Sequence, residues 1–173
     1  MSISMSKASL SPFILTLEAL GAILDKAGAH AAAKKIDPAV LAATRLFPDM
    51  LPLSRQVLIA TDQAKNGSAR LAGIEPPKFE DTETTLEQLK ARVVKTVAFL
   101  RTIDPAKIDA AAGKEIVFPV GPNKMKMKGG DYLSHFVLPN FYFHAAMAYA
   151  LLRECGVEIG KRDFLGAVPM TPA

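Results

Sequence analysis

The side chains best suited to chemistry are the three histidines, His30, His135 and His144. Two imidazoles on one helix share a metal ion when they lie four residues apart, because those positions stack on one face. His135 and His144 are nine residues apart, so nine steps of about 100° put them on opposite faces of a helix. A kink at Pro139 would bend the axis far more than it would rotate a face. We therefore expect that these two histidines do not share a metal ion.

A polar cluster is expected around His144 instead. Asn140 lies one turn earlier on the same helix, and a second helix presents Gln56 on its inner face. We favour a hydrogen-bonded cluster that satisfies a buried histidine; the alternative is a site for a divalent ion such as zinc or nickel. Both metals prefer imidazole, thiolate or carboxylate ligands to neutral amides. The residues expected to line this pocket are Asp49, Leu53, Phe136 and Phe141.

Two other reactive side chains are interpreted as structural. His30 lies in an alanine-rich helix end, where a positive charge near a helix C-terminus is favourable. Cys155 is about 16 Å along the helix from His144 and is expected to fill a small space in the core. It is the only cysteine, so no internal disulfide can form. The sequence contains no phosphate-binding loop, nucleophile elbow or dinucleotide fingerprint.

Two groups of charged residues occur at regular spacing. Lys124, Lys126 and Lys128 alternate with methionines, so a strand would carry three positive charges on one side. We interpret them as protection of an edge strand against pairing with other chains; contact with nucleic acid or an acidic partner is the alternative. Asp62 and Lys65 have helical spacing and are expected to form an exposed ion pair.

Long amphipathic helices must position these residues. Apolar residues recur at spacings of three and four over four ranges, which are 5–33, 48–72, 86–103 and 131–154. Pro12 predicts a kink or a late start in the first helix, and Pro48 and Pro52 would lie in or near the first turn of the second. The alternating residues 116–128 predict a β-hairpin. The expected fold is mainly α: a four-helix bundle with a short β-hairpin between helices three and four, in one domain spanning 1–173.

The composition narrows the class of protein. Half of the 173 residues are apolar, which excludes a disordered chain. The 21 basic and 17 acidic residues are interspersed, so the net charge of +4 does not predict a nucleic-acid partner. No unbroken apolar run reaches the length of about 20 residues that spans a bilayer, and the N-terminus lacks the pattern of a signal peptide. We expect a cytoplasmic protein with no membrane partner.

Four segments resemble an uncharacterised family of bacterial and fungal proteins that is grouped with the DinB/YfiT-like metalloenzymes. The segments are FPDMLPLSRQV at 47–57, ARLAG at 69–73, PNFYFH at 139–144 and GKRDFLG at 160–166. The resemblance extends over nearly the whole chain. It implies a DinB-like four-helix bundle that is often a homodimer.

The resemblance also implies a metal site and shows where this chain departs from it. Members of the wider superfamily usually hold a divalent metal with three histidines, one on helix two and two spaced four residues apart on helix four. Here helix four has Asn140 four residues before His144, and helix two has no histidine, so that Gln56 or Asp49 would have to substitute. Two of the three ligand positions therefore differ from the pattern.

Two functions follow from these observations. The first is a small-ligand-binding or structural module with a degenerate metal site. The second is a metal-dependent or thiol-dependent transferase or hydrolase with an altered ligand set centred on His144. The superfamily supports the second function only by analogy, whereas one imidazole is a weak basis for a divalent site.

Overall fold

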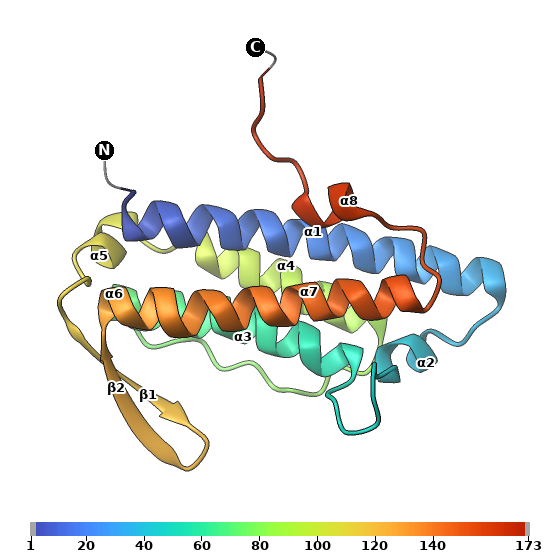
Figure 1. Cartoon of the computed structure of the whole chain (residues 1–173), viewed down its shortest axis with the longest axis horizontal. Helices are drawn as coiled ribbons and strands as arrows, with labels where there is room; N and C mark the ends of the chain where they lie inside the picture. The colour runs from blue at the N-terminus through green and yellow to red at the C-terminus, as the bar shows by residue number, and fades with distance from the viewer. Residues whose placement is uncertain (1–2, 172–173) are drawn as a thin grey trace.

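Four long helices lie side by side in the computed structural model, which describes residues 3–171 (Figure 1). They are α1 (Met5–Lys34), α3 (Leu53–Ala72), α4 (Leu86–Leu100) and α7 (Leu138–Glu154). Helix α1 packs against α4, and α3 packs against both α7 and α4. The mainly helical class and the four-helix bundle expected from the sequence are confirmed.

Local sequence signals explain where α1 begins and ends. The Ser4 side chain accepts a hydrogen bond from the backbone N–H of Lys7, and Lys35 ends the helix with left-handed backbone geometry. Of the two alternatives predicted at Pro12, a kink or a late start, the late start is wrong, because α1 is continuous from Met5 through that proline. Burial of Leu10 and Phe13 on either side of Pro12 offsets the single hydrogen bond that proline cannot donate.

The start of α3 differs from the prediction. Its first residue is Leu53, and Pro52 takes an extended conformation at the N-cap position instead of lying inside the first turn. A proline restricts the residue before it to extended geometry, so the helix does not continue back through Leu51. The preceding residues form an irregular turn after the short helix α2 (Pro38–Ala43), closed by a hydrogen bond from the Leu53 N–H to the Thr44 carbonyl.

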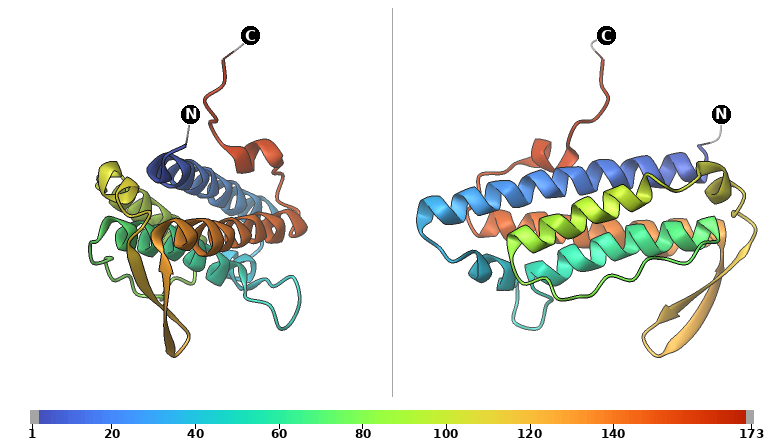
Figure 2. Two further views of the ribbon diagram at one scale, coloured as in Figure 1. Left: turned by 60° about the vertical axis from the view of Figure 1, so that its left-hand side comes forward. Right: turned by 180° about the vertical axis from the view of Figure 1, so that it is seen from behind.

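Helices α3 and α4 run in the same direction, so the connection 73–85 returns along the length of the bundle (Figure 2). A capping box begins α4: the Thr85 hydroxyl accepts from the Gln88 N–H, and the Gln88 side chain accepts from the Thr85 N–H. Helix α4 ends at Leu100, and a short helix α5 (Pro105–Asp109) follows.

The predicted β-hairpin is present between α5 and the last long helix (Figure 1). Strand β1 (Glu115–Val120) pairs antiparallel with β2 (Asn123–Lys128). Phe118 is buried against Tyr132, with ring centroids 4.6 Å apart, while the three lysines of β2 are exposed. One face of the hairpin therefore packs on the bundle, and the lysines lie on the other face.

The fourth helical run is continuous along the chain, but the type of helix changes within it. It consists of α6 (Gly129–Asp131), a π-helical segment η1 (Tyr132–Val137) and α7. Gly129 is required at its start, because a Cβ atom there would lie 2.1 Å from the Ala111 carbonyl oxygen. After α7 the chain forms a five-residue helix, α8 (Lys161–Leu165), which packs on α1.

Helix α1 is long and apolar enough to cross a membrane, judged by length and composition alone. In the bundle, however, 56% of its most apolar window is buried. Phe13, Leu17 and Ala27 are fully inaccessible among the other helices. This burial is the pattern of a core helix in a soluble bundle.

Candidate functional site

His144 and Gln56 form a hydrogen-bonded pair between α7 and α3. The His144 Nδ1 atom lies 2.7 Å from Gln56 Oε1, and Gln56 Nε2 donates to the Leu51 carbonyl at 3.1 Å. Since the amide nitrogen is committed to Leu51, the amide oxygen must accept, and the proton of the neutral imidazole lies on Nδ1. His144 Nε2 therefore keeps its lone pair for another partner.

The local sequence explains how the pair is positioned. Gln56 is in the first turn of α3 and is buried beside Leu53 and Val57, which are fully inaccessible. The buried stripe of α7 includes Phe141 and Ala145, and α7 packs directly on α3. His144 is half-buried at the margin of this contact. Burial lowers the pKa of His144 below its ordinary value of 6.5, because desolvation disfavours the imidazolium.

Asn140 does not join the pair. Its Nδ2 atom donates to the Phe136 carbonyl of its own helix at 2.7 Å, and the side chain is half-buried. Of the three residues predicted to form the cluster, the structure brings together Gln56 and His144. Asn140 lies one turn away, with its amide nitrogen bonded within the helix.

The residues expected to line a pocket have different surroundings. Leu53 and Phe141 are fully buried in the core, where Phe141 packs against Phe13 at 4.6 Å between ring centroids. Phe136 is half-buried and packs against Phe118 of the hairpin. Asp49 lies exposed in the turn before α3. Asp49 does not share a helical face with Gln56, because α3 begins only at Leu53.

The other histidines and the cysteine lie apart from this pair. His135 is exposed on η1, where its Nδ1 atom lies 3.1 Å from the Ser134 hydroxyl. His30 and Cys155 are half-buried near the ends of α1 and α7. Within residues 3–171 no group of three or more histidine, cysteine, aspartate or glutamate side chains is arranged to hold a metal ion.

A three-histidine metal site, which the family resemblance implies, does not fit these donors. His144 offers one imidazole nitrogen. The Gln56 oxygen already accepts from His144 Nδ1, and Asn140 offers only its amide oxygen. Neutral amide oxygens are poor ligands for zinc and nickel, so this donor set is a poor match for either metal.

Sequence reasoning missed a buried arginine between α3, α4 and the connection 73–85. The five N–H groups of Arg92 have five partners: Thr61 Oγ1, Asp62, Asp81, Glu83 and the Glu80 carbonyl, at 2.9 to 3.1 Å. Its side chain is 1% exposed. Burial alone would lower the pKa of Arg92, but the hydrogen bond to Glu83 and the three nearby carboxylates raise it overall. The hydrogen bonds of Arg92 thus hold the connection 73–85 against α3 and α4.

The expected exposed pair of Asp62 and Lys65 belongs to this same network. Lys65 Nζ lies 2.9 Å from Asp62, but the lysine side chain is only 4% exposed, so the prediction of an exposed pair is wrong. The Lys65 Nζ atom also lies 4.2 Å from the centroid of the Phe79 ring, which belongs to the connection 73–85. The acidic run at 80–83 supplies two of the carboxylates that accept from Arg92, those of Asp81 and Glu83.

Comparisons with known proteins agree with this fold. The model of a domain of unknown function, DUF1993, matches residues 5–165. A crystal structure of a DinB family member protein from Shewanella denitrificans is 39% identical, with a TM-score of 0.90; the match covers 97% of this chain and 95% of that one. No curated protein matches significantly. The resemblance inferred from the sequence is confirmed: the chain belongs to the DUF1993 family and has a DinB-like fold.

Proposed function

We propose that the protein is a small-ligand-binding module in which a hydrogen-bonded pair replaces the metal site of DinB-like enzymes. The observation that carries the proposal is the 2.7 Å contact between His144 Nδ1 and Gln56 Oε1. This contact uses the amide oxygen that a metal ion would need. It also fixes the neutral imidazole with Nε2 as a free hydrogen-bond acceptor.

The surroundings of His144 suggest the class of ligand. The Phe143 ring lies edge to face with the imidazole at 5.1 Å between centroids and is 54% exposed. Leu51, whose carbonyl holds Gln56, is 42% exposed. A small, partly apolar molecule with one hydrogen-bond donor would match an imidazole acceptor beside apolar surface.

A second function is supported by the same imidazole. A histidine that donates through Nδ1 to a fixed acceptor presents Nε2 as a base or as a ligand. This arrangement would suit a metal-dependent or thiol-dependent transferase or hydrolase centred on His144. The poor match of Gln56 and Asn140 to a divalent ion makes it the weaker candidate.

Elemental analysis tests the two functions against each other. The protein is purified without a histidine tag, beside His144→Ala and the matched control His135→Ala, which removes an exposed imidazole. The binding proposal predicts no stoichiometric zinc or nickel in any of the three proteins. Stoichiometric metal in the wild type and in His135→Ala that is lost in His144→Ala would contradict the binding proposal and support the enzyme.

Ligand binding is tested by NMR with ¹⁵N-labelled histidine and a library of small molecules. Binders are expected to shift the Nε2 signal of His144 and to leave the signals of His135 unchanged. If no binder shifts His144, or if binders shift both histidines equally, the proposed ligand site is contradicted.

We also propose a cytoplasmic location, supported by the burial of α1 in the bundle, which cell fractionation would test.

A further inference from the structure

The hairpin of β1 and β2 projects from the bundle (Figure 1, Figure 2). Among residues 3–171 its sheet has two strands, so each strand is paired on one side. One face of the hairpin buries Ile116 and Phe118 against the bundle. The other face carries Lys124, Lys126 and Lys128, whose side chains are exposed. The outer edge of β2 therefore lies in solvent beside a row of three lysines.

The register of the hairpin determines which backbone groups of β2 point outward. A two-residue turn joins the strands, and such a turn is closed by a hydrogen-bonded pair, here Val120 and Asn123. Hydrogen-bonded and non-hydrogen-bonded pairs alternate along an antiparallel ladder. Lys124, Lys126 and Lys128 therefore belong to non-hydrogen-bonded pairs, and their backbone N–H groups point away from β1.

Two observations agree with this alternation. Just beyond the strands, the Gly129 N–H donates to the Lys114 carbonyl at 2.9 Å, where the alternation requires a hydrogen-bonded pair. Pro119, which has no N–H, lies opposite Lys124, where the ladder needs no donor. The outer edge of β1 thus lacks one donor that the outer edge of β2 keeps. Within residues 3–171, no carbonyl outside the hairpin accepts from the backbone N–H groups of the three lysines.

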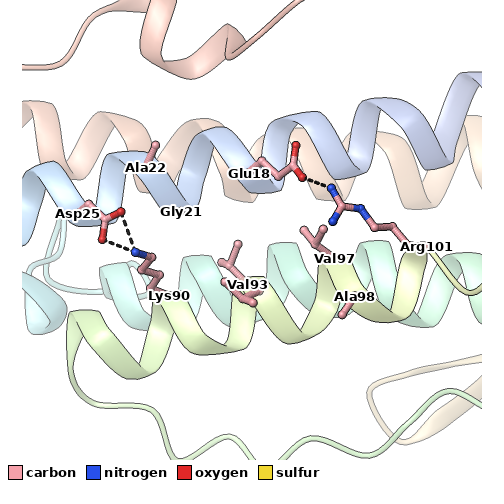
Figure 3. A pocket seen from close by; sticks show the side chains of 10 residues that line it. Glu18, Gly21, Ala22, Asp25, Lys90, Val93, Val97, Ala98 and Arg101 are labelled. Atoms are coloured by element: carbon pink, nitrogen blue, oxygen red, sulfur yellow. Dashed lines mark hydrogen bonds and ion pairs between the residues drawn. The ribbon is translucent and has the colours of Figure 1, made fainter.

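The charges of these lysines are less neutralised than those of basic residues on the bundle. In the hollow between α1 and α4, basic side chains have acidic partners on the neighbouring helix: Lys90 with Asp25 and Arg101 with Glu18 (Figure 3). In the hairpin, Lys126 pairs with Glu115 at 3.0 Å, and both side chains are more than half exposed. Lys124 and Lys128 form no ion pair within residues 3–171. The outer edge of β2 therefore carries a net positive charge.

We propose that this edge binds an extended segment of a partner protein in which acidic and apolar residues alternate. The segment adds a third strand to the hairpin, and its carbonyl groups accept from the outward N–H groups of β2. Residues two apart are separated by about 6.8 Å along any strand. Acidic side chains at alternate positions therefore lie opposite the three lysines, where opposite charges stabilise cross-strand pairs. The apolar side chains between them lie on the other face beside Met125, which is 51% exposed.

Other occupants fit this edge less well. A second β2 strand would set one row of lysines against another, and like charges directly opposite each other are unfavourable. Single-stranded nucleic acid is held by aromatic rings as well as by positive charge. Within residues 115–128, the lysine face carries no aromatic ring and includes the carboxylate of Glu115. The lysines therefore discourage pairing with most strands and favour an acidic one, so protection of the edge and recognition of a partner have the same physical basis.

The test is a fluorescence anisotropy titration of the full chain with a labelled synthetic peptide of alternating glutamate and valine. Saturable binding is expected. Lys124→Gln combined with Lys128→Gln should weaken binding about tenfold, because each lost charge pair contributes about threefold. The matched control combines Lys107→Gln with Lys161→Gln, which removes two exposed charges elsewhere and should leave the affinity unchanged. Circular dichroism checks that both double variants keep their helices.

Amide hydrogen exchange measured by NMR tests strand addition itself. The bound peptide should slow exchange at the Lys124 and Lys126 N–H groups and leave that of Met125, which already faces β1, unchanged. N-methylation of the peptide nitrogens that face β2 should abolish binding without altering the charge of the peptide. Absence of binding, or equal binding of the methylated peptide, would overturn the proposal. Tighter binding of a thymidine oligonucleotide of equal charge would also overturn it and identify nucleic acid as the partner. None of these results depends on ligand binding at His144.

Discussion

Replacing Arg92 by methionine should destabilise the protein strongly. The substitution keeps an unbranched apolar stem but removes the guanidinium, whose five N–H groups all have partners. The lost partners lie on α3 and on the connection 73–85. The variant therefore tests whether this buried cation holds the long connection against the bundle.

The expected loss in the free energy of unfolding depends on how exposed the carboxylate partners of Arg92 are. Removing one partner from a buried ion pair costs about 3 to 5 kcal/mol. The side chains of Glu83, Asp62 and Asp81 are 15%, 29% and 41% exposed, so water can solvate them after the substitution. This places the loss at the lower end, about 3 kcal/mol. At about 3 °C per kcal/mol for a domain of this size, Tm should fall by about 9 °C.

Urea unfolding followed by circular dichroism measures the loss. Arg92→Lys keeps the charge but cannot reproduce the planar fork, so it should lose about half as much, about 1.5 kcal/mol. The matched control is Lys126→Gln, which breaks an exposed hairpin pair with Glu115 and should cost less than about 0.5 kcal/mol. A loss below about 1 kcal/mol for Arg92→Met, or a loss equal to that of the control, would refute the reasoning.

Three further predictions concern single residues. Burial depresses the pKa of His144 below 6.5. As pH falls below 6.5, this imidazole is therefore protonated in the unfolded chain before it is protonated in the folded protein. The free energy of unfolding should therefore decline below pH 6.5, and His144→Gln should flatten this part of the urea-unfolding profile; an unchanged slope would contradict the assignment. Hydrogen bonds from Ser6 lower the pKa of Asp109 below 3.8, so its stabilisation is present above pH 3.8 and lost as pH falls through the lower folded value. Asp109→Asn should thus lower Tm at pH 7 and reduce the acid dependence, and an equal acid dependence in both proteins would argue against it. Gly129→Ala should cost about 2 kcal/mol, because the new Cβ would meet a backbone carbonyl at 2.1 Å. Gly113→Ala, where a Cβ would meet nothing within 4 Å, should change Tm little, and equal losses in the two variants would refute the steric argument.

The sequence was sufficient for the fold because its strongest signals are local. Apolar spacing located the four long helices, and the change of period at 116–128 located the hairpin. Helix ends were less predictable. The start of α3 depended on whether Pro52 would lie inside the first turn or before it, and both are compatible with a proline near a helix start.

The π-helical segment η1 could not have been predicted from spacing alone. Its residues read as part of one amphipathic helix, but the wider turn carries Tyr132 and Val137 into the core while His135 stays exposed. The 100° rotation per residue used for His135 does not apply within η1. The structure places His135 exposed on η1 and His144 half-buried on α7.

The candidate site was predicted in part. The pairing of Gln56 with His144 could be predicted because both residues lie on the buried stripes of two long helices. Arg92 and Lys65 were missed because a charged residue on a helix is usually solvated. Their burial depends on the connection 73–85, whose path over α3 and α4 is a tertiary feature that no local pattern specifies.

The central claim is that Gln56 holds neutral His144 with its proton on Nδ1 and with Nε2 free. Long-range ¹H–¹⁵N NMR of the wild type with ¹⁵N-labelled histidine at pH 7.5 measures this tautomer directly. The Nδ1–H form is predicted for His144, and Gln56→Leu should shift the balance toward Nε2–H. An Nε2–H tautomer or a charged imidazole in the wild type would contradict the account.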